Sequence, residues 1–319
     1  MKKEFDVICI GAALVDMIAR VERHPEKDDE VFVSELKLLS GGAAANTAYA
    51  CGRLGLKTAF IGKLGENDAF KNKILDDFRI GNVETRFIKY SKEKGTGSAY
   101  VALNPEGERR IYAHSGAANL LSENEILEKE LISTRVIFLS SLKNIKPFIK
   151  AGKIGKKFNI PVILNPGMLI IDQGINNIKV LLEHIDILIL SRKEFSTLFR
   201  TSINYKNVDL VREYADKLLS LGVRVIIITL GEKGALLITK EMSELIDPYP
   251  VDEVIDTTGA GDSFSAGFIL GFTKSLDFDF NPLRSYVRLG NFVASRCIRK
   301  LGARNGIPNY EELKELYYS

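Results

Sequence analysis

Short runs of apolar and β-branched residues recur along the chain without polar alternation. They occupy residues 7–10, 58–61, 135–139, 161–164, 185–190, 223–229 and 235–239. Continuous apolar runs of this length predict strands that are buried on both faces. Helical spacing fills most of the intervals, at residues 43–54, 68–79, 123–131, 146–158 and 209–221. Strands that alternate with helices predict right-handed βαβ units, so we expect a doubly wound α/β domain over residues 1–319, with a mostly parallel central sheet flanked by helices.

Two stretches, at about residues 15–39 and 97–112, depart from this rhythm. The first stretch has alternating character around residues 30–34. In the second, residues 104–108 read Asn-Pro-Glu-Gly-Glu, a turn signal between two strand-like flanks. The two stretches are predicted to pair as a small separate sheet, a lid that would exclude water from a cleft. An edge hairpin packed on the body explains the local pattern equally well.

The charge and hydropathy of the chain serve only to exclude some classes of partner. The chain carries 44 Lys and Arg against 41 Asp and Glu, and it has no basic stripe interleaved with aromatic residues. We therefore expect no nucleic-acid partner. No stretch of about 18 apolar residues occurs, so no membrane span is expected, and the N-terminus does not resemble a signal peptide.

The cysteines and histidines give no sign of a metal site or a disulfide framework. Cys9, Cys51 and Cys297 are far apart and lie in apolar segments, which is typical of free thiols in a reducing compartment. The three histidines are equally scattered, and none forms a metal-ligand pair. We expect a cytoplasmic protein.

The most informative run is residues 256–268, which read DTTGAGDSFSAGF. The small residues Gly259, Ala260 and Gly261 allow a sharp turn whose backbone N–H groups, with the positive end of the following helix, suit a phosphate group. Asp262 would repel that phosphate, and general-base work explains its presence: a carboxylate there can accept the proton of an attacking hydroxyl. The Gly-Ala-Gly triplet alone is equally typical of an ordinary helix N-terminus.

Competing phosphate-binding motifs do not match the chain. No Gly-x4-Gly-Lys-Ser/Thr loop occurs, and the protein-kinase signatures are absent. A dinucleotide fingerprint would need Gly or Ala at position 264, where Phe264 stands.

Two further runs carry candidate acceptor-binding groups. In residues 41–55, two glycines precede a helix of small residues that contains Asn46, a polar side chain able to bind ligand hydroxyls. Asp16 follows the first strand, at the end of the sheet where open α/β sheets bind ligands. Simple tolerance of Asn46 by Ala-rich packing, and a surface position for Asp16, remain open alternatives.

These three runs, in this order, resemble the ribokinase family, also called the PfkB carbohydrate kinase family. Residues 41–46 look like its first signature and residues 256–262 like its second. Residues 229–234 are similar to the strand and turn that flank the nucleotide, and residues 301–308 to the C-terminal closing segment. The resemblance covers nearly the whole chain.

The resemblance implies roles for the matching positions. Asp262 would be the catalytic base, and the anion hole for the phosphoryl oxygens would be formed by Gly259, Ala260 and Gly261. The acceptor sugar would be held by Asp16, Gly42 and Asn46.

The resemblance also implies ATP and Mg²⁺ as cofactors. The residues expected to contact or support the nucleotide are Thr229, Gly231, Gly234, Asn291 and Glu194. Some members use K⁺, and part of that metal site is matched by Asp256 and Thr258. The predicted small sheet corresponds to the family's lid, through which we expect a homodimer.

Two positions depart from the family pattern. Ser191 stands where an Asn linked to Mg²⁺ and phosphate is common, although Glu194 of the same motif is kept. Ala43 stands where ribokinases usually carry Lys, which weakens the assignment of ribose itself.

The predicted function is transfer of the γ-phosphate of ATP to a hydroxyl of a small sugar, which would be a pentose, a hexose or a sugar acid. A nucleoside kinase is the alternative, with Phe32, Tyr100 and Tyr112 supplying an aromatic surface under the lid. An ATP-binding sensor without turnover is the alternative outside enzymes, and the intact Asp262 argues against it.

Overall fold

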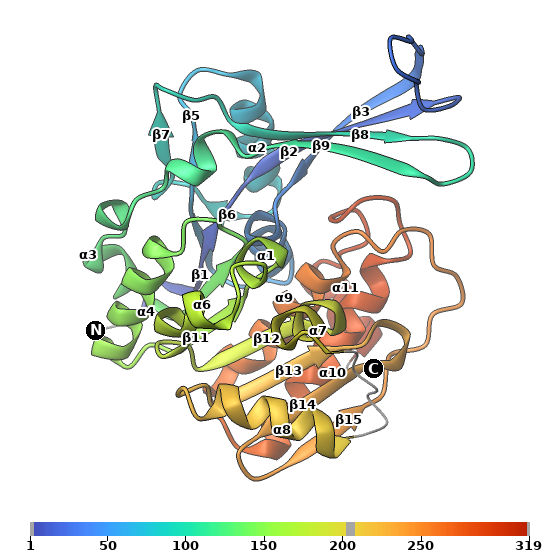
Figure 1. The fold of residues 1–319 in the computed structure, drawn as a ribbon. Helices are drawn as coiled ribbons and strands as arrows, with labels where there is room; N and C mark the ends of the chain where they lie inside the picture. Colours follow the sequence, from blue (N-terminus) through green and yellow to red (C-terminus); the bar gives the residue numbers. More distant parts are fainter. Residues whose placement is uncertain (1–2, 202–207, 318–319) are drawn as a thin grey trace.

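The computed structural model describes residues 3–201 and 208–317. Its centre is a nine-stranded sheet in the order β15-β14-β13-β12-β11-β10-β1-β4-β6 (Figure 1). The strands are β1 (Phe5–Gly11), β4 (Thr58–Ile61), β6 (Val83–Glu84), β10 (Thr134–Ser140), β11 (Val162–Asn165), β12 (Ile187–Ser191), β13 (Val225–Thr229), β14 (Ala235–Thr239) and β15 (Ser243–Ile246). All pairings from β13 to β6 are parallel, and β14 is antiparallel to both of its neighbours. The predicted mostly parallel sheet is confirmed.

Four of the five predicted helices lie within about two residues of their predicted bounds. They are α1 (Ala43–Arg53), α2 (Ala69–Ile80), α4 (Lys146–Phe158) and α8 (Val208–Leu219). The helix expected after the Gly-Ala-Gly turn is α9 (Ala260–Ser275). The structure adds α5 (Met168–Ile171), α6 (Ile175–Leu182), α7 (Arg192–Phe199), α10 (Phe280–Cys297) and α11 (Tyr310–Tyr317).

The helix predicted over residues 123–131 was wrong as a continuous element. The segment forms a 3₁₀ turn at Glu123–Glu125, an extended stretch, and then one helical turn, α3 (Glu128–Leu131). Ile126 and Leu131 are both buried. Five residues apart on a continuous helix they would point in directions about 140° apart, so the break lets both reach the core.

Both faces of the central sheet are buried, because helices cover each of them (Figure 1). Along β1, Val7 and Cys9 belong to a core formed with α1, α9 and α10. Ile8 and Ile10 belong to a second core formed with α4, α6, α7 and α8. This double burial explains the unbroken apolar runs of the sequence. Within residues 3–201 and 208–317, no helix is both long and apolar enough to cross a bilayer.

A second, four-stranded sheet projects beyond the body at the top of Figure 1. It contains β2 (Leu14–Val21), β3 (Val33–Gly41), β8 (Gly97–Leu103) and β9 (Arg109–His114) in the order β3-β2-β8-β9. The pair β8 and β9 is the predicted hairpin, and β2 joins it in parallel. The stretches that broke the βαβ rhythm therefore form a separate small sheet and not an edge hairpin of the body.

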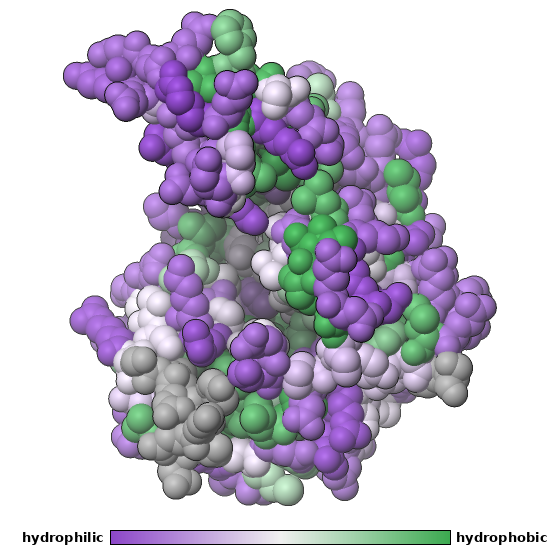
Figure 2. All heavy atoms as spheres, turned by 90° about the vertical axis from the view of Figure 1, so that its right-hand side faces the viewer, coloured by the Kyte–Doolittle hydropathy of each residue, from purple (hydrophilic) through white to green (hydrophobic). Residues whose placement is uncertain are grey.

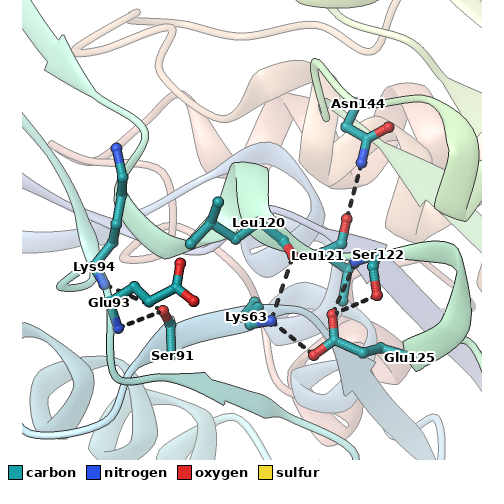
Figure 3. A network of polar contacts seen from close by, with 9 residues as sticks. All are labelled: Lys63, Ser91, Glu93, Lys94, Leu120, Leu121, Ser122, Glu125 and Asn144. Atoms are coloured by element: carbon teal, nitrogen blue, oxygen red, sulfur yellow. Dashed lines mark hydrogen bonds and ion pairs between the residues drawn. The ribbon is translucent and has the colours of Figure 1, made fainter.

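The base of this small sheet is fastened to the body by a polar network (Figure 3). Lys63 lies in β5 (Lys63–Gly65), which pairs with β7 (Lys89–Ser91). Its Nζ contacts a carboxylate oxygen of Glu125 at 2.8 Å and the carbonyl oxygen of Leu120 at 3.4 Å, both in the segment that follows β9. Asn144 donates to the carbonyl oxygen of Leu121 at 3.0 Å. The chain is thus anchored to the body directly after it leaves the small sheet.

Candidate active site

The turn that opens α9 is shaped by close packing against the C-terminal segment. Gly259 is the N-cap of α9, with a φ of 78°. A Cβ atom at this position would lie 2.5 Å from Cβ of Ala303, so both backbone conformation and space require glycine. A Cβ atom at Gly261 would have no heavy atom of the described residues within 4 Å. The turn is therefore rigid on one side and faces open space on the other.

The anion hole differs in one respect from the expectation. The amide of Ala260 donates to the carbonyl oxygen of Thr257 at 3.2 Å, so this predicted donor is occupied within the turn. The amides of Gly261 and Asp262 belong to the first helical turn, where backbone N–H groups have no partner from the helix itself. The two first-turn amides are thus the better candidates for binding phosphoryl oxygens.

Asp262 projects from the first turn of α9 toward α1. Its Oδ2 accepts a hydrogen bond from Nδ2 of Asn46 at 2.9 Å, although the two residues are 216 positions apart. Burial raises the pKa of Asp262 to about 6; the bond from Asn46 and the charge of Arg304 oppose this rise, and the charge of Glu194 adds to it. A carboxylate with this pKa is ionised at neutral pH and still basic enough to accept a proton.

Asp16 lies beside the two glycines of the first signature. A Cβ atom at Gly41 would lie 2.2 Å from Oδ2 of Asp16, and one at Gly42 would lie 2.5 Å from the carbonyl oxygen of Ala12. Burial raises the pKa of Asp16, while the charge of Arg304 lowers it. Asp16 is part of β2 in the small sheet, not of the loop that directly follows β1. The three predicted acceptor-binding residues therefore meet where the two sheets join.

Arg304 is a site residue that our sequence interpretation missed. Its Nε donates to Oδ1 of Asn46 at 3.0 Å, and its Nη1 lies 3.6 Å from Oδ2 of Asp77. Burial lowers the pKa of Arg304 to about 10, so the guanidinium is still protonated at neutral pH. The sequence feature that could have indicated this role is an arginine among small residues in segment 301–308.

The predicted nucleotide-contacting residues lie at the end of β13, in the turn that follows it, in α7 and on α10. Thr229 ends β13, and Gly231 follows it with a φ of 62°. A Cβ atom at Gly231 would have no described heavy atom within 4 Å, so this position is open, whereas one at Gly234 would lie 2.1 Å from the carbonyl oxygen of Ile246. Asn291 donates to the carbonyl oxygen of Asp247 at 2.8 Å and so ties α10 to the segment after β15. Nucleotide contacts by these residues stay predictions.

Ser191 and Glu194 form a capping box at the start of α7. The Glu194 carboxylate accepts from the amide of Ser191 at 2.6 Å, and Ser191 Oγ accepts from the amide of Glu194 at 3.2 Å. Ser191 therefore caps the helix, as an Asn at this position could also do. No cluster of three Asp, Glu, His or Cys side chains able to hold a metal occurs among the residues with described positions. Mg²⁺ usually keeps water and substrate phosphate ligands with one or two carboxylates, and the buried Glu194 fits that mode.

Asp256 and Thr258 close the loop before α9. Asp256 Oδ1 accepts from the amide and the hydroxyl of Thr258 at 2.9 and 2.7 Å, and Oδ2 accepts from the amide of Gly302 at 2.8 Å. Burial alone would raise the pKa of Asp256, but these bonds hold it below its usual value. Both carboxylate oxygens of Asp256 thus already accept hydrogen bonds from the protein. K⁺ binding by Asp256 and Thr258 stays a prediction.

The site as a whole lies between the small sheet and the body. Asp16 approaches from the small sheet, Asn46 from α1, Asp262 from α9 and Arg304 from the C-terminal segment. Figure 2 shows the molecule hollowed between the overhanging small sheet and the body. The geometry brings the carboxylates of Asp16 and Asp262 to one cleft, beside the first turn of α9.

Comparison with known proteins agrees with this arrangement. The sequence model of the pfkB family of carbohydrate kinases matches residues 4–310. Ribokinase from Staphylococcus aureus is 32% identical over 313 residues, which cover 97% of this chain and 99% of that protein.

Solved structures show the same fold. The structure of Arabidopsis thaliana ribokinase complexed with ribose and ATP has a TM-score of 0.88 at 26% identity, with 100% of both chains covered. The nucleoside kinase of Methanocaldococcus jannaschii, an archaeal member of the ribokinase family, has a TM-score of 0.80 at 25% identity, covering 99% of this chain and 98% of that one. Because the family match and these relatives span nearly its whole length, this chain is a phosphotransferase with an alcohol acceptor and belongs to the pfkB family of carbohydrate kinases, the ribokinase family.

Proposed function

We propose that the enzyme transfers the γ-phosphate of ATP to a hydroxyl of a small sugar, which is a pentose, a hexose or a sugar acid. The observation that carries the proposal is Asp262, a carboxylate with a pKa of about 6 held by Asn46 beside the first-turn amides of α9. The acceptor docks between Asp16 and Asp262. Asp262 takes the proton of the acceptor hydroxyl as the hydroxyl oxygen attacks the γ-phosphorus, and the bond from the γ-phosphorus to the bridging oxygen breaks to release ADP.

The first turn of α9 supports the phosphoryl group in this proposal. Its backbone amides and the positive helix end stabilise the negative charge of the transferred group, and the space beside Gly261 leaves room for that group. ATP approaches along Thr229 and Gly231, with Glu194 near the phosphates and Asn291 near the adenine. When bound with the nucleotide, Mg²⁺ neutralises part of the phosphate charge.

The small sheet acts as a lid in this proposal. Its base is fastened by the network around Lys63 (Figure 3). In contrast, all six residues of β9 are exposed. The face that carries Asp16 points toward the body, because Leu39, the partner of Asp16 in β3, lies 3.3 Å from a Cβ atom built at Gly302. Closure of this sheet over the acceptor keeps water, a competing acceptor, away from the phosphoryl group.

The opposite face of the lid supports a homodimer. Leu38, Met17, Tyr100 and Tyr112 are paired in register across all four strands and form one apolar row. Leu38 is 44% exposed and Tyr112 is 68% exposed. Because neighbouring residues of a strand point to opposite faces, this row points away from Asp16. A second copy of the chain that covers this row would bury it, as a lid-to-lid dimer does.

The same register weighs against the nucleoside alternative. Of the three aromatic residues expected under the lid, Tyr100 and Tyr112 lie on the face that points away from Asp16. The third, Phe32, directly precedes β3 and is 84% exposed. The residues paired on the Asp16 face are Ala99 and Ala113, which offer no ring to stack on a base. The acceptor site beside Asp16 therefore suits a compact sugar better than a nucleoside.

A coupled assay over a panel of sugars, sugar acids and nucleosides tests the proposal. We expect turnover with a sugar or sugar acid and its loss in Asp262→Asn. Turnover confined to nucleosides would overturn the choice of acceptor. Tight ATP binding without turnover on any acceptor would instead identify a sensor that has lost catalysis.

A further inference from the structure

Arg304 occupies an unusual position for a charged side chain. It is only 9% exposed, and its guanidinium carbon lies 5.0 Å from the ring centroid of Tyr49 and 5.9 Å from that of Phe78. Burying an arginine in this way costs free energy unless its charge and donors are used. The residue therefore needs a role that a neutral side chain would not fill.

The hydrogen bonds of Arg304 point to that role. Neither Nη1 nor Nη2 has a hydrogen-bond partner among the residues whose positions the structure describes, and the ion pair with Asp77 is a loose one at 3.6 Å. The well-formed hydrogen bond of the guanidinium is the one from Nε to Oδ1 of Asn46, at 3.0 Å. The buried guanidinium of Arg304 thus acts mainly as a hydrogen-bond donor to Asn46.

This bond determines which way the Asn46 amide faces. A guanidinium can only donate, so it selects the oxygen end of the amide and leaves the NH₂ end to point the other way. That end donates to Oδ2 of Asp262 at 2.9 Å. In the flipped orientation an amide oxygen would face the carboxylate and an amide NH₂ would face the guanidinium, and both contacts would be repulsive.

The charges around Asp262 come from several elements. Glu194 of α7 disfavours the ionised carboxylate, as does burial, and the Cys297 thiol of α10 is also close enough to interact with it. Arg304 favours the ionised form, both directly and through Asn46. Asp16 and Asp77 interact with Arg304 itself and keep it protonated. Arg304 is therefore the cation that offsets burial and Glu194 in this balance.

We propose that Arg304 is a positioning residue that, through Asn46, holds the carboxylate of Asp262 oriented and charged for removal of the acceptor's proton. The inference deepens the proposed function and rests on it. It also assigns a purpose to the C-terminal segment, where Ala303 supports the anion turn at Gly259 and its neighbour Arg304 supports the base.

The test compares Arg304→Met and Arg304→Lys with the wild-type enzyme in pH profiles of kcat/KM. The wild-type profile should fall below about pH 6, where Asp262 becomes protonated. Arg304→Met removes the charge and the bond, so its acid limb should move up by about 1 pH unit, which lowers kcat/KM roughly fivefold at pH 6. Arg304→Lys keeps the charge but not the Nε bond, so its acid limb should stay near that of the wild type while kcat falls.

A matched control uses an arginine outside the site. Arg284 pairs with Glu244 at 2.8 Å, and Arg284→Met should leave the acid limb where it is. A ¹³C titration of the Asp262 carboxyl, assigned by the loss of its signal in Asp262→Asn, gives a second readout that needs no acceptor. Arg304→Met should raise this titration midpoint by the same amount.

The outcomes separate this inference from the proposed function. If the wild type phosphorylates no acceptor, the proposed function fails, and the carboxyl titration still decides the role of Arg304. An active wild type whose acid limb and carboxyl midpoint are both unchanged in Arg304→Met would overturn the inference. If Arg304→Met does not fold, Arg304→Lys decides, and an unaltered kcat and KM in that variant would overturn it.

Discussion

The turn before α9 and the small sheet contribute to the same cleft but are built in opposite ways. In the turn, Gly259 packs against Ala303, and the Asp256 carboxylate accepts three hydrogen bonds from Thr258 and Gly302. In the small sheet, every residue of β9 is exposed. Developing charge needs preorganised groups, whereas an acceptor must enter and leave. The comparison therefore leads us to expect the chemistry on the packed side and binding of the acceptor on the exposed side.

The largest expected effect comes from the packed side. Asp262→Asn removes the base while keeping the size of the side chain, so kcat should fall by about 1,000-fold. Binding of ATP, measured by calorimetry, should change little, because Asp262 is proposed to act on the acceptor. A variant that retains wild-type kcat would break the assignment of chemistry to this turn.

The second effect compares two glycines of the same turn. In Gly259→Ala, the alanine would have to adopt a left-handed backbone conformation, and its Cβ atom would clash with Ala303. We therefore expect a lower melting temperature and a kcat/KM reduced by about 100-fold. Gly261→Ala adds a methyl group to open space, so its melting temperature should match that of the wild type. Circular dichroism melts and the coupled assay distinguish the two variants. Equal melting temperatures would show that the turn is less tightly packed than described.

The third effect is expected on the exposed side. Asp16→Asn weakens hydrogen bonds to the acceptor, so KM for the acceptor should rise roughly 10- to 100-fold. The value of kcat and the KM for ATP should change less, since Asp16 is proposed to bind the acceptor and not to accept its proton. A fall in kcat with an unchanged KM would place Asp16 in the chemistry and contradict the division between the two regions.

The smallest effect on catalysis is expected from the outer face of the small sheet. Leu38→Glu places a charge in the apolar row, so light scattering should show a shift from dimer to monomer. Ile111→Glu is the matched control, because Ile111 is 61% exposed but lies on the alternate face of β9 from Tyr112. A wild-type protein that is monomeric at assay concentration would refute the proposed lid-to-lid dimer.

The sequence predicted the parts of the fold that local pattern determines. Unbroken apolar runs indicated the strands of the central sheet because helices cover both of its faces. The turn at residues 104–108 indicated the hairpin of β8 and β9. The break in the helix at 126–127 was missed, because helical spacing does not reveal that Ile126 and Leu131 must both reach one core.

The site was predicted in part for a related reason. Asp262 and Asn46 stood out because an acid in a phosphate turn and a polar residue in an Ala-rich helix are locally unfavourable. Their hydrogen bond across 216 positions depends on tertiary packing and was not predicted. Arg304 was missed because an arginine between small residues looks like a surface residue until its burial is known.

The amide of Gly302 donates a hydrogen bond to Asp256, 46 positions earlier in the chain, and Ala303 packs against Gly259. Both contacts come from a segment that follows every strand of both sheets in chain order. During synthesis on the ribosome, the sheets and α9 can therefore form before the phosphate-binding turn acquires its final shape. A chain that ends after α10 would lack both contacts with the turn, so we expect the enzyme to become active only after its last residues have been synthesised.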